Sequence, residues 1–201
     1  MQIGRLLDFL LGYLVILVTP GPNMLVVGGV AALRGVRGAL PICCGIAMGA
    51  AALVASIALV AAGVTSRDPE WEVAGRWLAV GLLAWGAVFV ARLRPPGETT
   101  MPGRRSGVAA FGTGFCTAAT NPLTAAFCAA QAIGPLASHP EVLVLAPALV
   151  GMAALGFALL VAVLLARPRF RAAALAWHRP IRLTAALSLA LMALTTATTP
   201  P

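Results

Sequence analysis

The stretch Thr19-Pro20-Gly21-Pro22-Asn23 interrupts an apolar run that extends from residue 6 to residue 33. A proline inside a helix removes one backbone hydrogen bond, and its ring clashes with a preceding carbonyl. The residue before each proline is also disfavoured in helical geometry. A run of 28 residues would extend about 42 Å as a helix, against a hydrocarbon core of about 30 Å. The stretch therefore predicts a broken helix, with the break near the middle of a membrane.

The composition is that of an integral membrane protein with a single domain. The 201 residues are 60% hydrophobic and 10% charged, with a mean hydropathy of +0.95. A soluble domain carries about 25% charged residues. The net charge of +8 comes from arginines in short loops between apolar runs. Because no basic stripe with interleaved aromatic residues accompanies that charge, we do not expect a nucleic-acid partner.

Six apolar segments are long enough to cross a bilayer, which takes about 20 residues. Each must be helical, because lipid offers no partners to backbone polar groups. Eleven of the fourteen arginines fall in the connections after the first, third and fifth segments. This asymmetry places those connections in the cytoplasm and both termini outside, with the lipid bilayer around the helices. The predicted segments are 6–33, 39–64, 71–91, 108–133, 142–166 and 181–198.

A second interruption mirrors the first. Thr120-Asn121-Pro122 lies inside the fourth segment, and Pro122 follows Pro22 by one hundred residues. Each interruption falls in the first helix of a three-helix half, and two halves with an odd number of spans have inverted topology. Paired breaks in such halves are typical of a transporter's substrate site. We expect one repeat at 1–93, a cytoplasmic loop at 94–107 and a second repeat at 108–201; the alternative is two unrelated packing kinks.

The breaks also predict a kind of ligand. A helix that starts at a break presents unpaired N–H groups and a positive dipole end, and one that ends there presents carbonyls. Such a site suits a zwitterion such as a free amino acid. A polar stripe on the fourth segment, at helical spacing, faces the same region or bonds to a neighbouring helix. The candidate substrate-binding residues are Thr19, Pro20, Gly21, Pro22, Asn23, Thr117, Asn121, Pro122 and Thr124.

The sequence resembles the LysE/RhtB amino-acid exporters. The residues that carry the resemblance are Thr19 to Asn23, Gly35-Val36-Arg37, Gly45-Ile46-Ala47-Met48-Gly49, and then Gly114-Phe115, Asn121-Pro122 and Phe127. The resemblance implies an exporter of amino acids or related metabolites in a bacterial plasma membrane, driven by the proton-motive force, and it leaves a homodimer open. The family commonly has Lys where this chain has Leu123. That difference favours a smaller, neutral amino acid over a basic one.

Two alternatives remain open at the level of sequence. One is a transporter of metal ions or of other small solutes in the wider superfamily; a metal ion would need carboxylate, His or Cys clusters, which the spans do not offer. A membrane redox protein would need facing thiols, and the first segment has no Cys. We expect no cofactor, no metal site and no enzymatic activity. The cysteines are Cys43, Cys44, Cys116 and Cys128.

Overall fold

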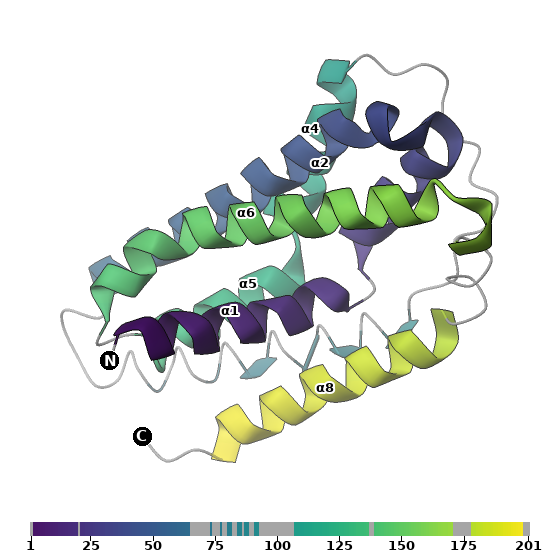
Figure 1. Ribbon diagram of the computed structural model, residues 1–201. Coiled ribbons are helices and arrows are strands. Elements are labelled where there is room, and N and C mark those ends of the chain that lie inside the picture. Colours follow the sequence, from purple (N-terminus) through teal and green to yellow (C-terminus); the bar gives the residue numbers. More distant parts are fainter. Residues whose placement is uncertain are drawn as a thin grey trace.

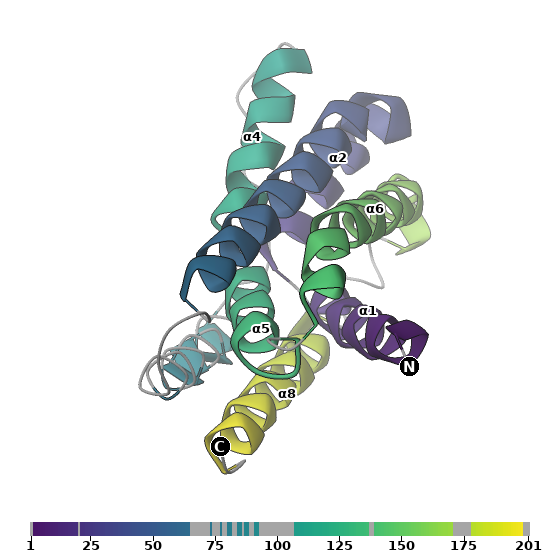
Figure 2. The same ribbon diagram turned by 90° about the vertical axis from the view of Figure 1, so that its left-hand side faces the viewer.

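The computed structural model describes residues 2–19, 21–64, 107–136, 139–170 and 178–198, with scattered positions between 73 and 92. Within these residues every regular element is a helix, and the chain folds as a bundle (Figures 1 and 2). The main helices are α1 (Gln2–Val18), α2 (Pro22–Val64), α4 (Gly107–Ala119), α5 (Pro122–Ile133), α6 (Pro140–Leu165) and α8 (His178–Thr198).

Both interruptions predicted from the sequence are present. Helix α1 ends at Val18 and α2 begins at Pro22, while α4 ends at Ala119 and α5 begins at Pro122. Each new helix therefore starts on a proline, which is favourable because the first helical residue needs no N–H partner and its φ is already fixed. The prolines thus begin helices instead of kinking them.

Helix α2 is two helices joined at Gly35. This glycine has φ 67° and ψ −177°, and the chain turns sharply there between a short helix at 22–34 and a long one at 36–64 (Figure 1). The sequence analysis placed the first connection at this point, between segments 6–33 and 39–64. Only glycine adopts such a backbone conformation at low cost.

The long part of α2 is the centre of the packing. It contacts α4, α5 and α6, and α1 in turn packs against α5 and α6 (Figure 2). Helix α6 faces this core with small residues four positions apart, which form one stripe of a helix. These buried residues are Val142, Ala146, Val150, Ala154, Ala158 and Ala162.

The opposite faces of the helices are apolar as well. On α6, Val144 and Met152 are 77% and 73% exposed, and on α2 Leu59 is 75% exposed. Exposed leucines continue along α8, at Leu187 and Leu194. Monomeric soluble proteins rarely expose continuous apolar surface of this kind. A lipid environment accounts for it, because it solvates apolar side chains on the outside of a bundle.

Two of the described helices are long and apolar enough to cross a membrane on their own, at Pro22–Ala62 and Pro140–Leu165. Helices α4 and α5 are shorter because the break divides the predicted fourth segment. In the predicted third segment, 71–91, the described positions are helical, and the rest lie outside the described residues. The predicted cytoplasmic loop lies outside them too, except for residue 107.

Candidate functional site

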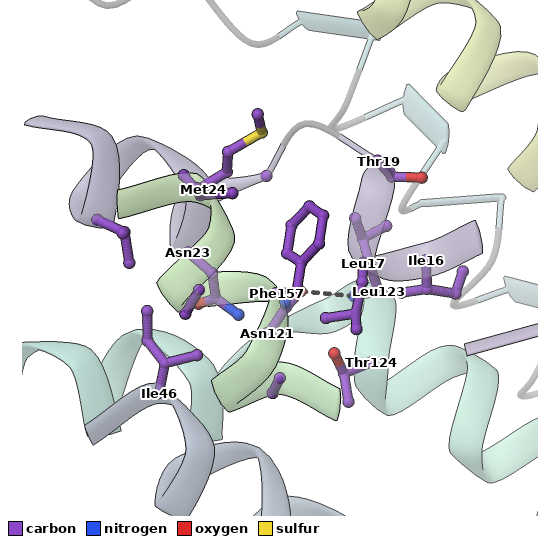
Figure 3. Close-up of a pocket in the computed structure, with 15 residues that line it drawn as sticks. Ile16, Leu17, Thr19, Asn23, Met24, Ile46, Asn121, Leu123, Thr124 and Phe157 are labelled. Atoms are coloured by element: carbon purple, nitrogen blue, oxygen red, sulfur yellow. Dashed lines mark hydrogen bonds between the residues drawn. The ribbon is translucent and has the colours of Figure 1, made fainter. Parts of the chain in front are cut away.

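A cavity lies where the two breaks meet. Its volume is about 30 Å³, and side chains from α1, α2, α5 and α6 form its wall (Figure 3). The residues that line it are Ile16, Leu17, Thr19, Gly21, Asn23, Met24, Val27, Ile46, Asn121, Leu123, Thr124, Ala154, Phe157, Ala158 and Val161. The cavity thus brings together two segments that are one hundred residues apart in the sequence.

Five of the nine candidate residues line this cavity: Thr19, Gly21, Asn23, Asn121 and Thr124. Three do not line it. Pro22 and Pro122 form the first turns of α2 and α5, where they set the direction of the helices, and Thr117 lies one turn earlier on α4. The ninth candidate, Pro20, lies outside the described residues.

Asn121 holds the start of α5. Its side-chain Oδ1 accepts a hydrogen bond of 3.1 Å from the backbone N–H of Leu123, and its backbone is extended, with φ −72° and ψ 111°. This is the N-cap geometry, in which the side chain satisfies one of the N–H groups that a helix start leaves unpaired. At 7% exposure the cap is buried, so Asn121 is committed to the helix in this conformation.

Asn23, in contrast, does not cap a helix. It follows Pro22 instead of preceding a proline, so it lies inside the first turn of α2. Its Oδ1 is buried and has no hydrogen-bond partner among the described residues. Figure 3 shows the nitrogen of the Asn23 amide on the side of Asn121, with the oxygen on the other side of the amide. A buried acceptor without a partner costs about 1–3 kcal/mol. Asn23 therefore has an unsatisfied buried acceptor in the first turn of α2.

The threonines near the cavity differ in what their hydroxyls do. The Thr19 hydroxyl donates to the Val15 carbonyl at 3.0 Å, and the Thr117 hydroxyl donates to the Thr113 carbonyl at 2.7 Å. Both bonds run back along the residue's own helix. Thr124 is 2% exposed, and its side chain is a hydrogen-bonding neighbour of Tyr13 on α1. Of the three, Thr124 alone links two helices at the cavity.

An aromatic cluster joins α1 to α5 next to the cavity. The ring of Phe127 lies 5.6 Å from that of Phe9 and 6.2 Å from that of Tyr13, measured between centroids. A β-carbon at Gly12 would lie 2.9 Å from the Phe127 ring, so this glycine lets the helices approach. The cluster packs the N-terminal side of α1 against α5, beyond the cavity along α1.

Sequence reasoning missed the α6 wall. Ala154, Phe157, Ala158 and Val161 line the cavity, yet they belong to a helix that is apolar on every side. No polar residue marks its inner face, and the spacing of hydrophobic residues cannot distinguish inside from outside in such a run. Small residues four apart were the one available signal, because membrane helices favour them at close contacts.

No lining residue carries an ionisable side chain, among those that the structure describes. The described residues also hold no group of three His, Cys, Asp or Glu side chains that could bind a metal ion. All four cysteines are free, with Cys43 and Cys128 buried and Cys44 and Cys116 exposed. The polar chemistry of the cavity therefore consists of amides, hydroxyls and helix ends.

Comparison with known families gives one match. The model of the family described as LysE type translocator matches residues 14–199. The chain belongs to the LysE type translocator family. That match includes both breaks and every residue that lines the cavity, and it confirms the resemblance seen in the sequence. No curated protein and no solved structure matches the chain.

Membership in the LysE type translocator family sets the broad function. The protein is an integral membrane protein and a transporter of small solutes, and the family is one of transporters, not of enzymes. The helical architecture and the apolar outer surface agree with this.

Proposed function

We propose that the protein is a secondary transporter that exports amino acids or related small zwitterionic metabolites across the bacterial plasma membrane, using the proton-motive force. The observation that carries the proposal is the cavity between the two helix breaks. Broken helices that meet at one cavity are the membrane-protein form of an ion-binding helix terminus.

The topology that we propose has six spans in two inverted repeats, with the cavity near the midplane. Its support is the correspondence between the halves. In each half the first predicted segment is divided near its middle, and a proline starts the second piece, at Pro22 and at Pro122. The remaining predicted segments supply two further helices to each half. In this arrangement the two halves rock about the site and open it to one side at a time.

The helix ends suit a zwitterion in chemical terms. The N-termini of α2 and α5 both reach the cavity, through Asn23 and Met24 on one and Leu123 and Thr124 on the other. Their dipoles favour a carboxylate. The C-terminal turn of α1 reaches it through Ile16 and Leu17, and its carbonyl end favours an ammonium group. A ligand with both groups and no net charge matches these walls.

The volume of the cavity indicates that it must open to bind. About 30 Å³ holds one or two water molecules and no amino acid. Substrate entry therefore requires α1 and α2, or α5 and α6, to move apart. The breaks are the natural hinges, since the helix pieces on either side can rotate without breaking their internal hydrogen bonds. The conformation described here is a closed one.

Efflux from proteoliposomes tests the proposal. Vesicles that contain the purified protein are loaded with an equimolar mixture of the twenty amino acids, and the external solution is analysed by mass spectrometry. We expect selective efflux of some amino acids, increased by a proton gradient and reduced by a protonophore. If no amino acid leaves faster than from protein-free vesicles, with or without a gradient, the proposed function is wrong.

Proline replacement tests whether the break is the site. The double variant Pro20→Ala/Pro22→Ala removes both obstacles to a continuous helix, so efflux should fall at least tenfold while membrane insertion is retained. The matched control is Pro147→Ala, which changes a proline inside α6 that does not line the cavity. Normal efflux by the double variant would exclude a role for the break.

A further inference from the structure

The two asparagine side chains that line the cavity offer it hydrogen-bond donors and no acceptor. Asn121 Oδ1 accepts from the Leu123 N–H, and Asn23 Oδ1 is fully buried. The two amide nitrogens, Asn23 Nδ2 and Asn121 Nδ2, make no hydrogen bond to a described residue. Each amide nitrogen carries two N–H donors. A ligand that pairs with these asparagines must therefore bring the acceptor.

The helix cap decides which end of the Asn121 amide is left for a ligand. Only the carbonyl end of the amide can accept the Leu123 N–H, so the oxygen is held at the first turn of α5 and the nitrogen is the free end. The cap also holds the side chain in one orientation at the cavity wall. In Figure 3 the nitrogen of the Asn23 amide lies on the side of Asn121. Each of the two breaks thus contributes one amide nitrogen to the cavity.

The helix starts favour the same kind of ligand group. Asn23 and Asn121 lie at the starts of α2 and α5, where the first N–H groups have no partner within the helix and the dipole favours negative charge. None of the described residues that line the cavity is an aspartate or glutamate that could serve as the acceptor. A hydrogen bond to an ionised acceptor is about twice as strong as one between neutral groups. A carboxylate from the ligand would therefore satisfy both amides and both helix starts.

We infer that Asn23 Nδ2 and Asn121 Nδ2 donate to the carboxylate of the substrate, and that the transporter therefore requires a free carboxylate. Asn121 then has two roles, because its oxygen caps α5 while its nitrogen binds the ligand. Amides and esters of amino acids, which lack the ionised acceptor, are excluded. This inference rests on the proposed function. It names the substrate group that the same cavity selects and the atoms that select it.

Counterflow into proteoliposomes measures the requirement for a carboxylate. The probes are the amino acids that leave the vesicles in the efflux experiment above, each paired with its amide, for example L-valine with L-valinamide. The amide keeps the ammonium group and the side chain but replaces the carboxylate by a neutral group. Leak through the lipid is measured in protein-free vesicles and subtracted. The wild type should transport each amino acid at least about tenfold faster than its amide. If the amides move as fast as the amino acids, the inference is wrong.

Asn121→Asp separates the two roles of this side chain. Aspartate caps a helix as well as asparagine does, so hydrogen exchange in the first turn of α5 should be unchanged. The variant replaces two N–H donors by a negative charge, which repels a carboxylate and attracts the ammonium group of the amide. The ratio of the amino-acid rate to the amide rate should fall at least about tenfold, and Asn23→Asp should lower it in the same way. A merely structural role would change both rates and leave their ratio unchanged.

The matched control is Gln131→Glu, which makes the same change from amide to carboxylate near the end of α5, at a residue that does not line the cavity. It should leave the ratio at the wild-type value. If wild-type vesicles transport no amino acid at all, the proposed function fails. If they transport amino acids but Asn121→Asp, with its cap intact, keeps the wild-type ratio, or if Gln131→Glu lowers the ratio equally, the assignment of the carboxylate to these amides fails while the function stands.

Discussion

Gly45 of α2 lies directly against the backbone of Phe111 in α4, and a β-carbon at position 45 would collide with the Phe111 carbonyl oxygen. Gly49 meets the Phe115 carbonyl in the same way, and Gly114 meets that of Ile42. The Cα–H groups of glycines are suited to such contacts with carbonyl oxygens. These contacts join the helix before the second break to the core helix of the first half.

Replacing Gly45 with Ala should therefore destabilise the protein by about 1–3 kcal/mol, because a backbone carbonyl cannot move aside as a side chain can. The measurement is the fraction of monodisperse protein that survives heating in detergent, followed by size-exclusion chromatography. The control is Gly112→Ala on α4, where a β-carbon meets nothing within 4 Å. It should be neutral or slightly stabilising, since Ala favours a helix over Gly by up to about 1 kcal/mol. Equal stability of the two variants would contradict the packing.

The turn at Gly35 leads to a second prediction. With φ 67° and ψ −177°, this residue occupies a region that is essentially restricted to glycine. Gly35→Ala should therefore cost about 1–3 kcal/mol even though no atom lies within 4 Å of the added carbon. The same heating experiment measures it.

Gly156→Ala is the control for the turn. It has the same open surroundings, but it lies within helix α6, where the backbone needs no glycine. If the two alanine variants melt at the same temperature, backbone strain at position 35 is not the reason for the glycine.

The sequence predicted the positions of the breaks well because proline acts locally. The missing N–H of Pro22 and Pro122 and the clash of their rings do not depend on distant residues, and the structure starts a helix at each. The spacing of Gly45 and Gly49, four residues apart, is typical of glycines where two membrane helices approach closely, and both contact the backbone of α4. The helix breaks and the glycine spacing could be identified without knowledge of the tertiary structure.

The residues that line the cavity were harder to predict from the sequence. The predicted polar stripe assumed one continuous helix, but the break at Thr120 and Asn121 divides it between α4 and α5, and Thr117 lies outside the cavity. Phe157 could not be found, since α6 is apolar all round. Whether an asparagine caps a helix or faces a cavity also depends on its position relative to the proline, which is clear only once the helix start is known.

Asn121 provides a third prediction, on the start of α5. Asn121→Ala removes the acceptor of the Leu123 N–H and should cost about 0.5–2 kcal/mol. Asn121→Ser should recover most of this, because serine caps helices as well as asparagine. Hydrogen exchange followed by mass spectrometry should show faster exchange in the first turn of α5 for the Ala variant alone. Unchanged exchange in that variant would show that the hydrogen bond does not hold the turn.

The orientation of the chain can be tested with single cysteines. In a background where Cys43, Cys44, Cys116 and Cys128 are replaced by Ser, one cysteine is introduced at Arg37, at Glu141 or at Gly4, all of which are exposed. Because arginine-rich loops stay in the cytoplasm, a membrane-impermeant maleimide added to intact cells should label Gly4→Cys and Glu141→Cys but not Arg37→Cys. All three should react after permeabilisation.

The three positions test different parts of the topology. Labelling of Arg37→Cys alone in intact cells would reverse the orientation and place the termini inside. Labelling of Gly4→Cys together with Arg37→Cys would mean that the first predicted segment, broken at residues 19–23, returns to the side from which it started. That result would contradict a broken helix that crosses the membrane, and with it the placement of the cavity between two halves of opposite orientation.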